Sequence, residues 1–151
     1  MRNTIIIAIV SLFFLGCKKD TYSTIPTLTY KSVNTTKLYR DQIIEFNLDF
    51  TDSEGDVIDT MYVQKVSLNC AASNFFDRSP IPRFPTTKNL SGAILVSYSN
   101  GINNPGYITI ASRCNYNDTC YFRFMLKDQA GNKSDTAKSE VIVICANDDC
   151  L

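Results

Sequence analysis

Apolar and polar side chains alternate along several short segments of this chain. The clearest is 42–51, where Ile44, Phe46, Leu48 and Phe50 share one side and polar residues occupy the other. This two-residue period predicts a strand with one buried face. Six further segments show a similar pattern: 28–33, 60–68, 93–98, 107–111, 119–127 and 138–145. Helical spacing does not extend over a dozen residues anywhere, so we expect an all-β protein.

Clusters of Gly, Asn, Asp and Pro separate the predicted strands. About seven short strands, rich in β-branched and aromatic residues and divided by such turns, predict a single antiparallel β-sandwich of immunoglobulin-like type. A β-barrel is the alternative architecture. We place this domain at residues 27–151, after a signal peptide at 1–16 and a tether at 17–26.

The first twenty residues, MRNTIIIAIVSLFFLGCKKD, have the pattern of an export signal. The apolar run 5–15 is shorter than the roughly 20 residues that a membrane-spanning helix needs, and it fits the central region of a signal peptide. The segment 14–17, Phe-Leu-Gly-Cys, resembles the lipobox of bacterial lipoproteins, in which the cysteine is acylated and becomes the new N-terminus. The resemblance implies a lipid on Cys17 and anchoring in the bacterial cell envelope, where we expect the outer membrane. A plain secretory signal that leaves Cys17 as a thiol is the alternative.

Composition excludes several classes of function. The chain of 151 residues has 15 Lys and Arg against 15 Asp and Glu, and it contains no histidine. Nucleic-acid binding depends on clustered cations, so we expect no nucleic-acid partner. Hydrolases with a catalytic histidine and histidine-ligated zinc sites are excluded as well. We therefore expect no enzyme, and a small hydrolase acting through paired carboxylates remains an alternative.

Strand alternation sorts the connections between two ends of the predicted sandwich. One end, which we call the near pole, receives the tether and is expected to hold the turns 52–56 and 128–132 and the connection 99–105. The opposite end, the far pole, is expected to hold the long connection 70–89, the connection 112–118 and the C-terminus. Every cysteine after Cys17 is thereby predicted at the far pole.

Acidic residues gather at the near pole. Residues 41–64 contain seven acids and no lysine or arginine, so this stretch has an unbalanced negative field. Calcium prefers six to eight oxygen ligands, and we predict Asp52, Glu54, Asp56 and Asp128 as candidates to supply them. The alternative is a solvated turn in which Gly55 takes a positive φ and aspartates accept hydrogen bonds from nearby N–H groups.

Two of these segments carry a resemblance to a family. Residues 44–57, IEFNLDFTDSEGDV, and residues 122–134, FRFMLKDQAGNKS, are similar to the paired turns of bacterial envelope lipoproteins with a PKD-like or cadherin-like immunoglobulin domain. The resemblance implies the fold and the tether. Taking the sequence as a whole, we expect a lipid-anchored binding or accessory module. A calcium-stiffened structural or adhesion module is the alternative function.

The long connection 70–89 is the candidate contact surface. It contains three prolines, which reduce the entropy lost on binding, and the aromatic residues Phe75, Phe76 and Phe84. Such rings can stack on sugars, so we expect a glycan or an envelope protein as the partner. The alternative is that these rings fold back and cap the open end of the sandwich.

The cysteines that follow Cys17 are candidates for disulfide bonds. Export would place them in an oxidising compartment, and their odd number leaves one thiol over. Several pairings are open: Cys114 with Cys120 and Cys145 with Cys150 would close short loops, and Cys70 lies near Cys120 if the third and sixth strands pair as in immunoglobulins. Zinc is disfavoured because no CxxC spacing occurs.

Overall fold

The computed structural model describes residues 23–57, 59–82, 85, 87–147 and 150. Within them lie nine strands and one 3₁₀ turn, η1 (Ala71–Ser73). The strands are β1 (Thr27–Val33), β2 (Lys37–Leu38), β3 (Ile43–Asp52), β4 (Thr60–Ser67), β5 (Phe75–Pro80), β6 (Leu90–Ser99), β7 (Asp118–Lys127), β8 (Ala137–Lys138) and β9 (Ile142–Ile144). The predicted all-β fold is confirmed. In this part of the chain, no helix has the length and apolarity needed to span a membrane.

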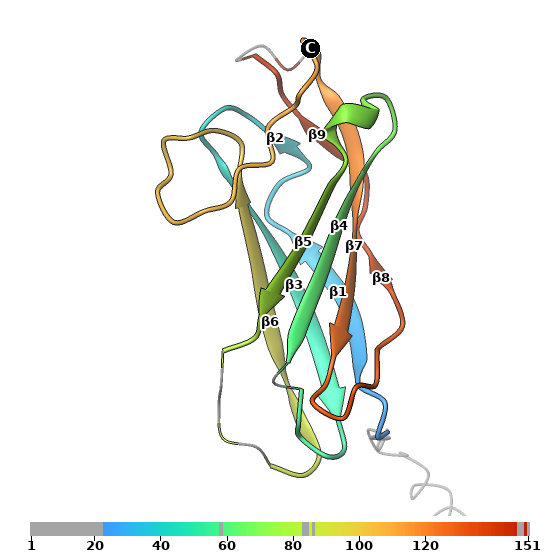
Figure 1. Cartoon of the computed structure of the whole chain (residues 1–151). Helices are drawn as coiled ribbons and strands as arrows, with labels where there is room; N and C mark the ends of the chain where they lie inside the picture. Colours follow the sequence, from blue (N-terminus) through green and yellow to red (C-terminus); the bar gives the residue numbers. More distant parts are fainter. Residues whose placement is uncertain (1–22, 58, 83–84, 86, 148–149, 151) are drawn as a thin grey trace, which may run out of the picture.

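Two sheets pack face to face as a sandwich (Figure 1). One has the order β1-β3-β6, and the other has the order β2-β9-β7-β4-β5 with β8 beside β7. Neighbouring strands are antiparallel except β2 and β9, which are parallel. The pairing of β4 with β7 is the one expected between the third and sixth strands of an immunoglobulin-like sandwich.

The core forms where the inward faces of the two sheets meet. In β3 buried positions alternate with more exposed ones, as the two-residue period predicts. The ring of Phe46 lies 4.6 Å from that of Phe122 and 5.1 Å from that of Phe124, measured between centroids. All three side chains are fully buried, and burial of a phenylalanine contributes roughly 1.5–3 kcal/mol.

Two predicted elements differ from the structure. The segment 70–89, expected to be a loop, contains β5, because its prolines stand at the end of the strand and beyond it. An edge strand tolerates proline there, since no ladder hydrogen bond is lost. Residues 107–111 form no strand; a single bridge joins Thr109 to Ser99, and Tyr107 and Ile108 are 41% and 46% exposed. The predicted strand 138–145 is divided into β8 and β9.

The additional strand moves two connections from the ends where they were expected. Because β5 returns toward the near pole, residues 81–82 and 87–89 lie there, the latter beside the turn 52–56, and β6 then runs to the far pole (Figure 1). The connection 99–105 is consequently at the far pole, where Asn100 donates to the carbonyls of Leu38 (3.0 Å) and Cys145 (2.9 Å). The turns 52–56 and 128–132 lie at the near pole, as predicted.

Cys70 lies between β4 and η1, Cys114 before β7, Cys120 near the start of β7, and Cys145 and Cys150 after β9, so all five cysteines after Cys17 lie toward the far pole, as predicted. Disulfides join Cys70 to Cys114 and Cys145 to Cys150, while Cys120 is a buried free thiol. The alternative pairing of Cys114 with Cys120 does not form. Two disulfides indicate a protein outside the cytoplasm.

Candidate functional site

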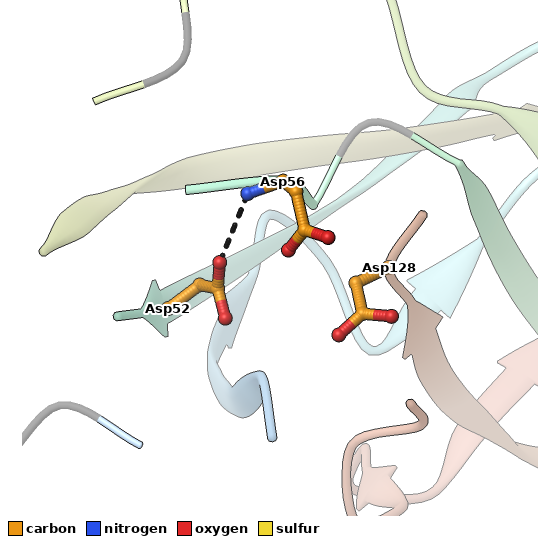
Figure 2. A group of neighbouring side chains, drawn as sticks. All are labelled: Asp52, Asp56 and Asp128. Atoms are coloured by element: carbon orange, nitrogen blue, oxygen red, sulfur yellow. Dashed lines mark hydrogen bonds between the residues drawn. The ribbon is translucent and has the colours of Figure 1, made fainter. Parts of the chain in front are cut away.

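Three aspartates converge at the near pole. Asp52 ends β3, Asp56 lies in the turn that follows, and Asp128 comes directly after β7. One carboxylate oxygen from each lies within 4.8 Å of the others. Figure 2 shows the three carboxylates facing a common space from two different turns. Asp52 and Asp128 are completely buried.

Local hydrogen bonds set the orientation of these carboxylates. Oδ2 of Asp52 accepts from the N–H groups of Gly55 (2.5 Å) and Asp56 (3.0 Å), which closes the first turn. In the second turn Asn132 donates from its backbone N–H to Oδ1 of Asp128 (2.7 Å) and from its side chain to Oδ2 (2.9 Å). Both turns use a carboxylate to satisfy backbone donors, which is the usual role of aspartate at such positions.

Residues 87–89 pack against the first turn. Gly55 has φ +74°, and a Cβ placed on it would lie 2.0 Å from the carbonyl oxygen of Thr87. The N–H of Asn89 donates to the carbonyl of Ser53 at 2.9 Å. Only glycine fits at position 55, because the site needs both the left-handed backbone and the close approach of Thr87.

Two oxygens of the cluster are left without a partner. Oδ1 of Asp52 and Oδ1 of Asp56 are buried and accept no hydrogen bond within the described residues. Burial, followed by the negative charges of Asp128 and Asp52, raises the pKa of Asp56 above its ordinary value. No lysine or arginine of the described residues forms a salt bridge with the three acids. A buried acceptor without a donor is unfavourable, so the geometry favours a bound cation.

Calcium suits the donor set. Three carboxylates supply between three and six oxygens, and backbone carbonyls and water complete a coordination number of six to eight. Of the four predicted ligands, the structure brings together Asp52, Asp56 and Asp128. Glu54 is exposed and does not belong to the group. Two features of the alternative, a solvated turn, are also present: Gly55 has a positive φ, and Asp52 accepts from the N–H groups of Gly55 and Asp56. The solvation it expects holds for Glu54 but not for Asp52, which is buried.

The tether meets the same turns. The N–H of Ser53 donates to the carbonyl of Ser23 at 3.0 Å, and the side chain of Asn132 donates to the carbonyl of Thr24 at 3.3 Å. Asn132 therefore contacts both Asp128 and the start of the described chain. Cys17, the predicted lipid site, lies outside the described residues.

The predicted aromatic contact residues separate from one another. Phe75 is half-buried and its ring meets that of Tyr98 edge-on at 5.5 Å, so it belongs to the margin of the core. Phe76, on the opposite side of β5, is 64% exposed and its ring lies 6.2 Å from that of Tyr62. Phe84 lies outside the described residues. The two described rings therefore form no common surface, because consecutive residues of a strand face opposite sides.

Sequence reasoning missed a pocket at the far pole, which we call the far-pole pocket. It has a volume of about 380 Å³, and its lining includes Arg40, Asp41, Asn100, Asn103 and Thr109. The side chain of Asn103 donates to Oδ2 of Asp41 at 2.8 Å. No sequence signal could have found it, since residues 40–41 and 100–112 meet only in the folded chain.

Comparisons with known proteins concern the fold. No protein-family model matches the sequence, and no curated protein matches it. Among solved structures, the sporulation control protein Spo0M from Bacillus subtilis is similar with a TM-score of 0.45 and 6% identity, over 82% of this chain and 50% of the Spo0M chain. A Niemann-Pick type C2 protein from the Japanese carpenter ant has a TM-score of 0.41 and 11% identity, over 85% of this chain and 99% of that chain. The chain thus spans about half of the Spo0M chain, and neither similarity enters the functional argument.

Proposed function

We propose that this protein is a lipid-anchored envelope module whose near pole binds calcium and is stiffened by it. The observation that supports the proposal best is the buried carboxylate of Asp52, whose unpartnered Oδ1 lies in a group with Asp56 and Asp128. A calcium ion among these oxygens would give the orphaned acceptors a partner and offset the mutual repulsion of three negative charges.

The ion would act as a joint between the tether and the sandwich. Asp128 and Asp52 come from turns that contact Thr24 and Ser23 respectively, through Asn132 and Ser53. Calcium would therefore hold the two turns together at the point where the chain enters the domain. The affinity expected of an extracellular structural module is Kd about 10⁻⁴–10⁻³ M.

Calcium titration and melting of the purified protein test this proposal. At a calcium concentration of about 100 times Kd the stabilisation is about 2.7 kcal/mol, which corresponds to a rise in Tm of roughly 10 °C for a domain of this size. EGTA reverses the rise. Asp52→Asn abolishes it, whereas Glu54→Gln, which removes one charge from the same turn, leaves it intact.

A second readout tests the repulsion among the three carboxylates. Without calcium, Asp56→Asn melts higher than the original protein, because it removes one of three repelling charges. An unchanged melt with calcium, together with no heat of binding in calorimetry, would rule out the calcium site.

The anchor is supported by the sequence pattern of residues 1–20 and by the entry of the chain at the near pole. Mass spectrometry of protein extracted from its native membrane is expected to show acylated Cys17 as the first residue. Cys17→Ser is expected to release the protein from the membrane without changing calcium binding. Membrane retention of this variant would contradict the anchor and leave the calcium proposal standing.

Glycan binding at the far pole is a second candidate function. The far-pole pocket includes groups that can bind sugar hydroxyls, namely the Arg40 guanidinium, the Asp41 carboxylate and the Asn103 amide. Calorimetry with a panel of soluble oligosaccharides tests it, and Asn103→Ala is expected to abolish binding while Asn115→Ala, outside the pocket, leaves it unchanged. Absence of binding across the panel would remove this candidate.

A further inference from the structure

Strand β6 is an unprotected sheet edge. It is ten residues long, reads LSGAILVSYS, and contains neither a charged residue nor a proline. It pairs with β3 on one side only, and on the other side the described residues pair with it only at Ser99. Natural sheets usually guard such edges with charges, prolines or bulges, because an open edge accepts further strands.

The other edge strands are guarded. β5, which ends the second sheet beside β6, carries Asp77 and Arg78 and finishes at Pro80. β1, at the opposite edge of the β6 sheet, carries Lys31 and has a register irregularity between Tyr30 and Ser32. The lack of protection is therefore specific to β6 among these three edge strands, which indicates a role for that edge.

Hydrogen bonds at the end of β6 show which of its backbone groups point outward. The N–H of Ser99 donates to the carbonyl of Ile108 (3.0 Å), and the N–H of Ile110 donates to the carbonyl of Ser99 (2.9 Å), so both groups of Ser99 face away from β3. The N–H of Asn100, by contrast, donates toward Gln42, on the β3 side. The register with β3 is continuous from Leu90 to Ser99, so the outward groups recur at alternate residues: 91, 93, 95 and 97.

An apolar groove runs beside this edge. It has a volume of about 470 Å³, and its lining includes residues of both β5 and β6, which are edge strands of the two sheets. Its lining includes Phe50, Met61, Val63, Ile81, Ile94 and Val96. A strand added to β6 would bond to the outward backbone groups and place every second side chain in the groove.

We propose that β6 binds an extended segment of a partner protein by strand addition, with apolar side chains at alternate positions entering the groove. Among the described residues that line the groove only Asp77 is charged, and it already accepts from Tyr98 (3.1 Å) and Ser79 (2.9 Å), so uncharged inward side chains suit this lining. A second copy fits less well. Antiparallel pairing of two β6 strands would put the two near poles at opposite ends of the dimer, so the two tethers would leave it in opposite directions.

β3 supplies a probe for this edge. It already pairs with β6 over ten residues, and its alternate side chains Ile44, Phe46, Leu48 and Phe50 are all buried in the core. A fluorescently labelled peptide with the sequence of β3, IIEFNLDFTD, should therefore bind the free edge with its apolar side chains in the groove. The matched control is the same peptide N-methylated at the positions of Asn47 and Leu48. Consecutive N–H groups of a strand point to opposite edges, so this peptide lacks one donor on each edge.

Fluorescence anisotropy measures binding to the protein and to two variants. Ala93→Pro removes one outward N–H but no hydrogen bond to β3, and it is expected to weaken peptide binding about tenfold, equivalent to about 1.4 kcal/mol. Ala93→Ser keeps the N–H and is expected to bind as the original protein does. N-methylation of the peptide is expected to weaken binding at least tenfold, and this arm requires no change in the protein.

Three results would overturn the proposal. They are no binding of the unmodified peptide, equal binding of the N-methylated peptide, and unchanged binding by an Ala93→Pro variant whose melt shows it to be folded. Concentration-dependent dimers in sedimentation that Ala93→Pro dissolves would make a second copy the occupant instead. Binding of the peptide is expected to be the same in calcium and in EGTA, so the outcome does not depend on the near-pole site.

Discussion

Lys65 and Asp118 form an ion pair inside the sandwich, and its removal can be predicted in detail. Nζ of Lys65 donates to Oδ2 of Asp118 at 2.8 Å and to the carbonyl of Ile110 at 3.1 Å. Oδ1 of Asp118 accepts from the hydroxyl of Ser67. The exposed fractions of the two charged side chains are 1% and 0%. Each charge is therefore balanced only by groups that the fold supplies.

Removing one partner leaves the other charge buried and unpaired. We expect Lys65→Met to lower the free energy of unfolding by about 3–5 kcal/mol, because the Asp118 carboxylate keeps only one hydrogen bond and the Ile110 carbonyl loses its donor. Asp118→Leu is expected to have a loss of similar size. The double variant should lose far less than the sum, since two apolar side chains of similar volume replace a pair that paid a large desolvation penalty.

Urea denaturation followed by circular dichroism measures the four free energies of this double-mutant cycle. The pair Lys127 and Asp59 is the control: its N···O distance is also 2.8 Å, but its side chains are 29% and 33% exposed. The same cycle there is expected to show a much smaller coupling, because water screens the charges. Additive losses at Lys65 and Asp118, within about 0.5 kcal/mol, would refute the reasoning from burial.

Two further predictions concern the cysteines. Burial raises the pKa of Cys120 from 9.0 to about 12, so the folded protein is expected to resist iodoacetamide at pH 8 and to be alkylated there only in urea. Between pH 9 and about 12 the folded thiol keeps its proton and the unfolded one has lost it, so stability falls by about 1.4 kcal/mol per pH unit over this range. Cys120→Ala should lack this contribution, and an equal slope in both proteins would contradict it. The bridge Cys70–Cys114 spans 44 residues and Cys145–Cys150 spans 5, so loop entropy predicts losses of about 4 and about 2 kcal/mol on replacement by alanine pairs. Equal losses in urea melts would show that loop length does not decide their contribution.

The long strands could be predicted from the sequence because their burial is one-sided. β3 and β7 each alternate between the core and the outer face over ten residues, and this alternation is visible as a period in the chain. β2 could not be predicted, since it has only two residues and depends on pairing with β9, which is distant in sequence.

The predicted position of the cysteines at the far pole is correct partly because two errors in the predicted strands cancel. The sequence pattern does not predict β5, and it predicts a strand at 107–111 that does not form. The predicted number of chain reversals before β7 therefore equals the observed number. The connection 99–105 lies between β5 and the segment 107–111, so the two errors do not cancel there and its predicted pole is wrong. The pairing of Cys145 with Cys150 is one that the sequence offered, whereas the pairing of Cys70 with Cys114 was beyond it, because these two meet through loops whose course no local pattern describes.

The near-pole site shows most clearly what a linear pattern lacks. Spacing alone predicts three acids in the turn 52–56, but only folding separates exposed Glu54 from buried Asp52. The difference follows from β5: it returns the chain to the near pole, residues 87–89 then bond and pack against the turn at Ser53 and Gly55, and the carboxylate of Asp52 is enclosed between that turn and Asp128. Without this strand the same acids would stand in water, where their repulsion is weak and each oxygen finds a donor. The strand that the sequence pattern failed to predict is thus the element that turns an acidic loop into a candidate cation site.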